Sequence, residues 1–395
     1  MLSAPISFRL ALLLSLSLTI LGATFLFFSV QPPPQIAPTA VSMISPVLTK
    51  TPEPIIPTRT PRPTVLAAVA TSQPTRQPAS LPTATQWPPD VRSQIYRFGL
   101  LARAEDVPLA QQLGIPFTTL IDWNLSLTHP KLPGIDYWQM LRTSEDGFQL
   151  SWDVIEPFIT ANPGSVWIIG NEPDVRWQDN VTAERYATLY HEAYTTIKTI
   201  DPTARIAIAG VAQPTPLRII YLDTVLETYQ QHYGQPMPVD VWTIHAFILR
   251  EEADSWGVGI PTGMDTASGR LYTIDDHDDI VILQENINRF RQWLAQRGYA
   301  DKPMAITEYG ILLPPDYGFT PERVAQFMQQ SFDFFLTAVD TTLSDTDDHR
   351  LVQWWFWYMF RDDEAYPTGN IYDTQTQQLT GAGQTYVNYI NELLP

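Results

Sequence analysis

The sequence predicts an α/β protein with a single (β/α)8 barrel of the TIM type, preceded by a membrane anchor and a disordered stalk. Three observations carry this prediction: a charge-free apolar run near the N-terminus, a proline- and threonine-rich stretch behind it, and eight β-prone runs that alternate with helical patterns from Ile95 onward. Such alternation is typical of parallel βα units. The predicted parts are residues 1–30, 31–89 and 90–395.

The first part is predicted to hold the chain in a membrane. Residues 10–30 contain no charged side chain and are long enough to cross a bilayer as one helix. Arg9 precedes this run and the next basic residue after it is Lys50, which favours a cytoplasmic N-terminus. We therefore expect an extracytoplasmic, membrane-anchored protein. A cleaved signal peptide would give a secreted protein on the same side, but the run is long and no small-x-small cleavage site follows it.

The second part is predicted to be a linker. Residues 31–89 hold 15 of the 35 prolines, together with ten threonines, and show no apolar periodicity. This composition cannot bury a core and favours extended, semi-rigid conformers. We interpret it as a stalk that holds the following domain away from the membrane.

The third part has the size of an eight-unit barrel with insertions. Residues 90–395 contain 19 basic and 41 acidic side chains, a net charge of about −22, which argues against a nucleic-acid partner. The chain has no cysteine, so its stability must come from packing without disulfides. Nothing in the sequence determines the oligomeric state.

Eight segments fit the barrel strands in order. They are Tyr96–Leu101, Phe117–Trp123, Tyr137–Leu141, Val166–Gly170, Arg205–Gly210, Asp240–Ala246, Pro303–Thr307 and Val352–Met359. Helical periodicity follows Thr182 and runs from Leu283 to Leu294, while Thr320-Pro321 has the form of an N-cap followed by a first-turn proline. Residues 384–394 form the last predicted helix.

Three connections between these elements stand out. Between the second and third strands, residues 124–135 contain two prolines and no helical pattern. A long loop rich in Gly, Pro and Asp follows the sixth strand, at 249–278, and is predicted to shape the binding site. Its end, Asp275–Asp279, is predicted to cap the next helix, with calcium binding as the alternative.

Two of the apolar runs lead directly into a glutamate. Glu172 follows the fourth predicted strand within Trp167–Asp174, and Glu308 follows the seventh within Ala305–Gly310. The C-terminal strand ends of a barrel are where its catalytic groups lie. Cleavage of a glycosidic bond needs two carboxyl groups, one to protonate the leaving oxygen and one to attack or stabilise the anomeric carbon. Glu172 and Glu308 are therefore the predicted catalytic pair.

The strings Gly-Asn-Glu-Pro at 170–173 and Ile-Thr-Glu-Tyr-Gly at 306–310 make the chain from about Ile95 onward resemble the clan A glycoside hydrolases. Within that clan it looks most similar to the endo-β-1,3-glucanase-like cores and next to the β-xylosidase and iduronidase group. The resemblance implies that Glu172 is the general acid/base and Glu308 the nucleophile of a retaining mechanism. A retaining pair needs carboxyl groups about 5–5.5 Å apart. At that distance we expect Glu172 to stay protonated and Glu308 to stay charged near neutral pH.

The resemblance also implies a set of sugar-binding residues. The asparagine before the acid/base bonds the sugar 2-hydroxyl, a histidine after the sixth strand lies near the nucleophile, and a tryptophan ending strand eight floors the sugar site. The family often has His-x-Tyr where this chain has Phe247, so the tyrosine's contact with the nucleophile must be absent or come from elsewhere. The substrate-binding candidates are Asn171, His245, Trp357, Trp355, Trp123, Trp138 and, as a source of the missing hydroxyl, Tyr309.

No cofactor or metal is expected. The six histidines show no ligand spacing, and phosphate-binding loops and nucleophile elbows are missing from the sequence. The predicted function is a retaining glycoside hydrolase that cleaves a β-linked carbohydrate, β-glucan first and β-xyloside second. The alternatives are a non-catalytic carbohydrate-binding or cell-wall-associated barrel and a transglycosylase.

Overall fold

The computed structural model describes residues 94–126, 135–362 and 365–393. The predicted anchor and stalk lie outside the described residues and stay predictions, as does most of the connection at 124–135. Within the described ranges, none of the helices combines the length and apolar character that a membrane crossing requires.

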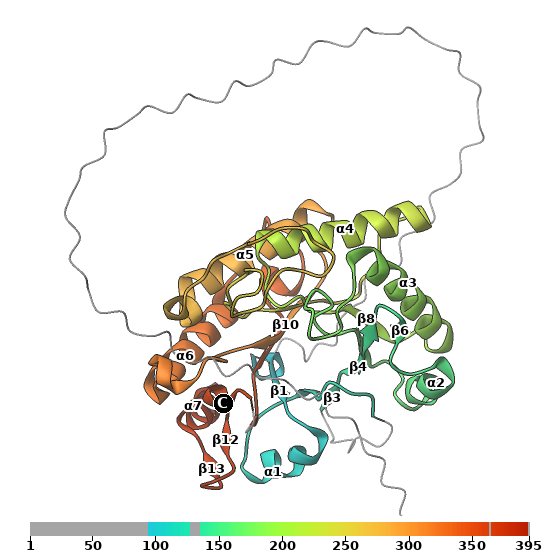
Figure 1. Ribbon diagram of the computed structural model, residues 1–395. Coiled ribbons are helices and arrows are strands. Elements are labelled where there is room, and N and C mark those ends of the chain that lie inside the picture. Colours follow the sequence, from blue (N-terminus) through green and yellow to red (C-terminus); the bar gives the residue numbers. More distant parts are fainter. Residues whose placement is uncertain (1–93, 127–134, 363–364, 394–395) are drawn as a thin grey trace, which may run out of the picture. The chain divides into compact units, whose positions relative to one another are not determined.

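The apolar runs form parallel strands in the predicted order (Figure 1). These strands are β1 (Phe98–Leu101), β2 (Thr119–Ile121), β3 (Asp136–Tyr137), β4 (Gln139–Leu141), β7 (Val166–Ile169), β8 (Arg205–Ile208), β9 (Trp242–His245), β10 (Met304–Tyr309) and β11 (Trp354–Trp357). The first strand, β1, pairs with both β2 and the last strand, β11. From β11 the pairing continues to β10 and β9.

The remaining strands connect the two ends of this curled sheet. A parallel bridge between Ala207 and Val241 joins β8 to the start of β9, and β8 pairs with β7, which pairs with β4. Only Trp138 separates β4 from β3, which pairs with β2. The predicted α/β class is confirmed, and these strands form a curled parallel sheet.

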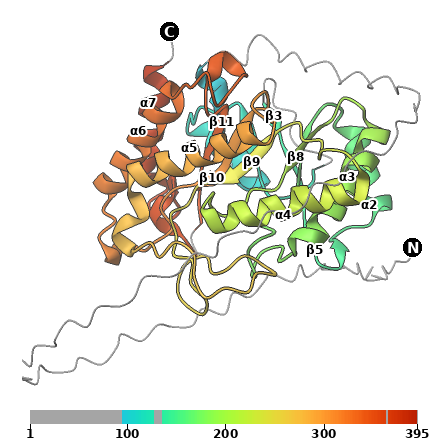
Figure 2. The same cartoon turned by 90° about the horizontal axis from the view of Figure 1, so that it is seen from above.

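Helices follow most strands and surround them (Figure 2). They are α1 (Val107–Gln112), α2 (Trp152–Ala161), α3 (Ala183–Ile200), α4 (Pro216–Tyr233), α5 (Ile280–Gln296), α6 (Pro321–Thr337) and α7 (Gly381–Glu392). The N–H of Arg323 donates to the Thr320 side chain, as the predicted cap requires. Asp279 likewise accepts from the first turn of α5, so the acidic run ends in a helix cap. Two short hairpins, β5–β6 (Thr143–Ser144 and Gly147–Phe148) and β12–β13 (Tyr372–Asp373 and Gln378–Leu379), and several short 3-10 helices lie between these elements.

Alternate residues of each strand face two different cores. In β11, Trp354 and Phe356 belong to the core inside the ring of strands. Trp355 and Trp357 belong instead to the larger core between strands and helices. The period of two along a strand produces this division, so neighbouring residues have opposite environments.

The long loop after β9 is held in place by a buried histidine. The imidazole of His277 lies 2.9 Å from the Ile248 carbonyl through Nδ1 and 2.9 Å from the Leu312 N–H through Nε2. Burial lowers the pKa of His277 to about 4, so the ring is neutral at neutral pH and Nδ1 carries the proton that it donates. The loops after β9 and β10 are thereby joined beside the strand ends.

Candidate active site

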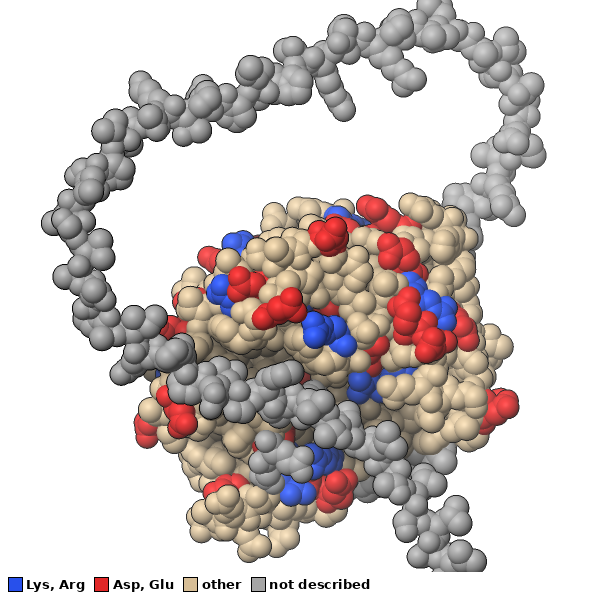
Figure 3. Space-filling model, viewed as in Figure 1, with Lys and Arg blue, Asp and Glu red and all other residues tan. Residues whose placement is uncertain are grey.

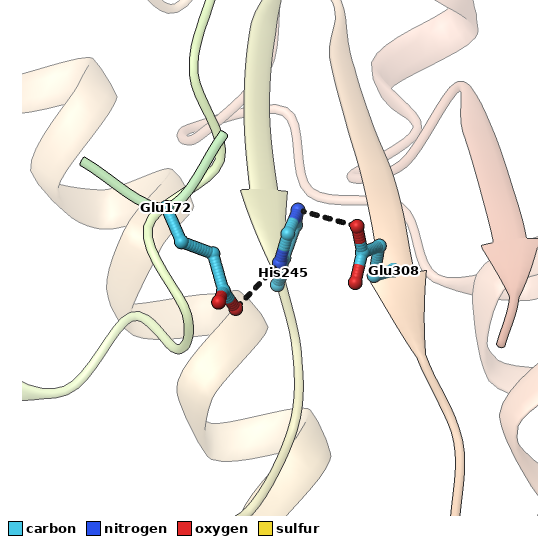
Figure 4. Close-up of side chains that lie close together, drawn as sticks. All are labelled: Glu172, His245 and Glu308. Carbon is cyan, nitrogen blue, oxygen red and sulfur yellow. Dashed lines mark hydrogen bonds and ion pairs between the residues drawn. The ribbon is translucent and has the colours of Figure 1, made fainter. Parts of the chain in front are cut away.

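Three strands bring two carboxylates and an imidazole together. Glu172 follows β7, His245 ends β9 and Glu308 lies near the end of β10, opposite His245 in the strand register. His245 Nδ1 lies 2.8 Å from Glu172 Oε1, and its Nε2 lies 3.5 Å from Glu308 Oε1. The imidazole therefore lies between the two carboxylates (Figure 4). We call Glu172, His245 and Glu308 the central cluster.

One carboxylate oxygen of Glu172, one of Glu308 and one ring nitrogen of His245 lie within 4.8 Å of one another. Glu172 adopts a left-handed backbone conformation, with φ of 43°, and its N–H donates to the Gly210 carbonyl at 3.1 Å. A positive φ is unusual for a glutamate and is typical of functional positions. The backbone after β7 thus directs the Glu172 side chain toward Glu308.

The central cluster is buried and electrostatically coupled. Burial raises the pKa of Glu308 to about 7; the charge on His245 opposes this shift and the charge on Glu172 adds to it. Burial also disfavours the charged form of His245, but the two glutamates outweigh burial and raise its pKa. At such distances the groups titrate together. The raised pKa of Glu308 differs from the expectation that this carboxyl is simply charged near neutral pH.

Trp123 makes the hydrogen bond to Glu308 that the family resemblance assigns to a tyrosine. Its indole Nε1 donates to Glu308 Oε1 at 2.7 Å. Trp123 lies just after the end of β2 and has a positive φ of 61°. Phe247 is buried and contacts His245 edge to face, with ring centroids 6.1 Å apart. Tyr309 faces away: its hydroxyl accepts a hydrogen bond from Ser331 on α6 at 3.2 Å. Tyr309 therefore does not supply the missing hydroxyl, because it lies on the outer face of β10.

Replacing Trp123 with phenylalanine should move the pH dependence of activity. The indole hydrogen bond lowers the pKa of Glu308, so its removal raises that pKa and leaves less carboxylate at a given pH. The rising limb of kcat/KM then shifts to higher pH, and activity at about pH 6 falls roughly tenfold, since a hydrogen bond to a charged group contributes about 1.5–3 kcal/mol. A pH–rate profile of both proteins measures the shift. An unmoved limb with a uniformly lower rate would contradict this account.

Asn171 lies beside the central cluster with an unused acceptor. Its backbone N–H donates to Asp179 at 2.8 Å, and its side-chain Nδ2 lies 3.4 Å from the Gln178 oxygen. The Oδ1 atom is buried and has no hydrogen-bond partner. Buried acceptors are ordinarily paired, so this oxygen is suited to receive a hydroxyl from a bound molecule.

The structure does not bring the other predicted tryptophans to the central cluster. Trp357 is buried between strand and helices, with its indole N–H donated to the Gly369 carbonyl at 2.7 Å. Trp355 lies in the same outer core, in contact with Phe98. Trp138 is enclosed inside the ring of strands and packs on Trp354. For Trp355 and Trp357 the alternation along β11 is the reason, because the residue that faces inward after Phe356 is Tyr358.

Tyr358 is a further residue beside the central cluster, in addition to those predicted from the sequence. Its ring centroid lies 6.0 Å from that of Trp123 and 6.0 Å from that of Phe247. Burial and then the charge of Glu308 raise the pKa of Tyr358, which places its hydroxyl in the field of the central cluster. Tyr366 contacts Tyr358 in turn, at 6.2 Å between centroids. The signal for Tyr358 was present in the sequence as the period of two, counted from an inward-facing Phe356.

A buried ion network supports the loop that carries Glu172. Arg218 Nε lies 2.6 Å from Asp174 Oδ2, and its Nη1 is hydrogen-bonded to Glu251. All three side chains are inaccessible to solvent. Burial raises the pKa of Asp174 to about 6, against the opposing charge of Arg218. Arg218 also donates to the Val258 carbonyl at 3.3 Å, so one cation joins the loops after β7 and β9.

Replacing Arg218 with methionine should destabilise the protein strongly. Two fully buried carboxylates would lose their cation, a change that costs about 3–5 kcal/mol and lowers Tm by roughly 10 °C. Arg176→Met is the matched control, because Arg176 is mostly exposed and its nearest carboxylate, Asp254, is 3.8 Å away. The control should leave Tm nearly unchanged. Equal melting temperatures for the two variants would contradict the role given to Arg218.

The central cluster is also the group of described residues that is able to ligate a metal ion. Neutral imidazole and carboxylate oxygens are suitable ligands for zinc. However, Nδ1 of His245 faces Glu172 and Nε2 faces Glu308. Only one of the two ring nitrogens could therefore bind an ion held between the glutamates. Ion pairing and hydrogen bonding within the cluster account for its geometry.

The strands, helices and paired carboxylates together define a class of protein, the clan A glycoside hydrolases, that this chain resembles in fold. Neither protein-family models nor curated protein sequences give a match. Solved structures give many. One is a GH128 (subgroup II) endo-β-1,3-glucanase from Pseudomonas viridiflava, 16% identical, with a TM-score of 0.51 over 74% of this chain and 96% of that one.

Two further similar structures differ in what they do. One is a GH128 (subgroup III) curdlan-specific exo-β-1,3-glucanase from Blastomyces gilchristii, with 16% identity, a TM-score of 0.50 and coverage of 74% and 97%. The other is a GH128 (subgroup VII) oligosaccharide-binding protein from Cryptococcus neoformans, with 14% identity, a TM-score of 0.50 and coverage of 79% and 99%. At these identities the similarity shows the fold alone, and the predicted resemblance to β-1,3-glucanase-like barrels is confirmed at that level.

Proposed function

We propose that this protein is a glycoside hydrolase that cleaves a β-linked glucan, with β-1,3-linked chains as the first candidate and β-xylosides as the second. The observation that carries the proposal is the buried pair Glu172 and Glu308, with carboxylate oxygens within 4.8 Å of each other near the ends of β7 and β10. The similarity in fold to β-1,3-glucanases supports the choice of glucan.

The proposed mechanism is retaining. Glu308 attacks the anomeric carbon as the glycosidic bond breaks, and Glu172 gives its proton to the leaving oxygen. Glu172 then removes a proton from water, which attacks the same carbon and releases Glu308. His245 is hydrogen-bonded to Glu172 and close to Glu308, so it holds both carboxyls in place. The charge of each glutamate raises the pKa of His245. Asn171 Oδ1 accepts from the sugar 2-hydroxyl, and Tyr358 and Trp123 contact the sugar ring.

The test is hydrolysis of soluble β-1,3-glucan, with xylo-oligosaccharides as the alternative substrate. Reducing ends report turnover, and proton NMR of the first product reports its anomeric form. A β-product formed before mutarotation supports retention, whereas an α-product means inversion, for which carboxyls lie roughly 6.5–9.5 Å apart. Longer products than the starting sugar would identify a transglycosylase.

A non-catalytic carbohydrate-binding protein is the second candidate. The observation that favours it is the similarity in fold to an oligosaccharide-binding protein, together with Phe247 in place of a tyrosine. Both glutamates and their mutual contact through His245 favour the enzyme. Binding of glucan without turnover, at any pH from about 5 to about 8, would decide for the binding protein.

We also propose that the protein acts outside the cytoplasm, anchored through residues 10–30 and extended by the linker at 31–89. The charge-free apolar run supports the anchor. The mixed acidic and basic surface seen in Figure 3 suits a neutral polymer better than a polyanion. Protease digestion of intact cells that express the full chain tests this placement, because an extracytoplasmic domain is digested while the membrane stays closed.

A further inference from the structure

Exposed aromatic side chains gather at the end of the barrel that holds the central cluster. In the part of the chain that the structure describes, four aromatic side chains are exposed: Trp177 at 44%, Trp256 at 37%, Tyr317 at 50% and Tyr96 at 36%. The first three lie in the loops after β7, β9 and β10, the same strands that carry the central cluster. Tyr96 precedes β1 and lies at the opposite, amino end of the strands.

The loops that carry Trp177 and Trp256 are packed against each other. A Cβ added at Gly259 would lie 3.5 Å from Cη2 of Trp177, so the second loop contacts the edge of that indole. Arg176, next to Trp177, lies 3.8 Å from Asp254 in the second loop. The two indoles are therefore carried on one joined surface. The guanidinium of Arg176 also lies 5.7 Å from the centre of the Trp177 ring, which restrains it.

This surface is continuous with the candidate active site. The N–H of Val175 donates to the Glu172 carbonyl at 3.0 Å, and the N–H of Gln178 to the Val175 carbonyl at 3.0 Å. The Gln178 side chain lies 3.4 Å from the amide of Asn171. Trp177 thus lies within one compact turn whose two sides contact residues of the site.

The tryptophans of the two cores gain the full stabilisation by burial, whereas Trp177 and Trp256 gain only part of it. Single exposed apolar residues are ordinary, but neighbouring exposed indoles beside a site are typical of a binding surface. The apolar face of a pyranose ring stacks on indole without requiring charge. A neutral sugar chain is therefore the ligand that fits.

We propose that Trp177 and Trp256 form a second carbohydrate-binding surface, which holds the part of a β-glucan chain that extends beyond the units at the central cluster. The inference rests on the proposed function for the identity of the polymer, but it concerns a separate set of contacts. The binding surface formed by Trp177 and Trp256 makes the protein select long glucan chains over short ones.

The experiment compares a soluble β-1,3-glucan with laminaritriose as substrates for Trp177→Ala, Trp256→Ala and the double variant. The kcat/KM on polymer, divided by that on the trisaccharide, should fall roughly tenfold in the double variant. Tyr96→Ala is the matched control, since it removes an exposed aromatic ring from the other end. A ratio equal to that of the wild type in the double variant, with Tm unchanged, would overturn the inference.

A binding assay separates this inference from the proposed function. Retardation in gels that contain the same β-1,3-glucan is measured for the wild type and the tryptophan variants, without any need for turnover. If the wild type lacks hydrolysis but the double variant loses retardation, the hydrolase proposal fails and the binding surface stands. If the wild type hydrolyses glucan but the double variant is retarded and cleaves like the wild type, only the binding surface is refuted.

Discussion

Glu308→Ala should abolish hydrolysis of the glucan while leaving glucan binding in place. Loss of the nucleophile removes the covalent intermediate, and removal of such a group from a catalytic set costs roughly 10⁴-fold or more in kcat. Binding persists because most contacts to a polysaccharide come from other residues. Initial rates and gel retardation with the same β-1,3-glucan measure the two properties separately.

The matched control for Glu308→Ala is Glu285→Ala, which removes an exposed glutamate from α5. Its kcat should equal that of the wild type. Because Glu308→Ala leaves the Trp123 indole without its acceptor and His245 Nε2 without the carboxylate that it faces, its Tm must be recorded. Glu308→Gln provides a version that fills the same space. If folded Glu308→Gln keeps more than a tenth of the wild-type kcat, Glu308 is not the nucleophile.

Glu172→Ala should slow hydrolysis in a way that depends on the leaving group. A general acid contributes roughly 10²–10⁴-fold when the leaving oxygen needs a proton. An aryl β-glucoside with an acidic phenol leaves without that proton, so its first step should be nearly unaffected. The comparison of glucan with a dinitrophenyl glucoside, each for wild type and variant, measures this difference.

A second readout distinguishes an acid/base role for Glu172 from a structural one. Azide is a small anion that enters the space of the missing carboxylate and attacks the glycosyl-enzyme without base assistance. The expected result is a faster second step with azide and a β-glucosyl azide product. Equal losses on both substrates, with no effect of azide, would assign Glu172 to structure alone.

The sequence predicted the strands well because their signal is local. Each barrel strand is a short β-prone apolar run, and the observed bounds differ from the expected ones by only a few residues, as for Arg205–Ile208 against a predicted end at Gly210. Helix starts were predicted for the same reason, since the Thr320 cap depends on a bond to Arg323 only three residues away. The two glutamates were singled out because their closeness to the end of an apolar run is also a local property, although β10 extends past Glu308 to Tyr309.

Side-chain facing was harder to predict, because it depends on the phase of each strand. By composition, either set of alternate residues in the tryptophan-rich run of β11 could face inward. In the structure Trp354 and Phe356 face inward, and Trp355 and Trp357 lie in the outer core. Tyr358 then faces the site instead. An error of one residue in phase exchanges inside and outside for a whole strand.

By itself, the sequence determined the class of fold, the order of its elements and the positions of two glutamates, one just after β7 and one near the end of β10. Only the tertiary structure decided that His245 lies between those glutamates, that Trp123 replaces a tyrosine in contacting Glu308, and that a buried Arg218 supports the site. Strand and helix signals arise from neighbours along the chain, whereas these contacts join residues 44 to 185 positions apart. Their distances, burial and pKa shifts exist only once the barrel brings separate strand ends together.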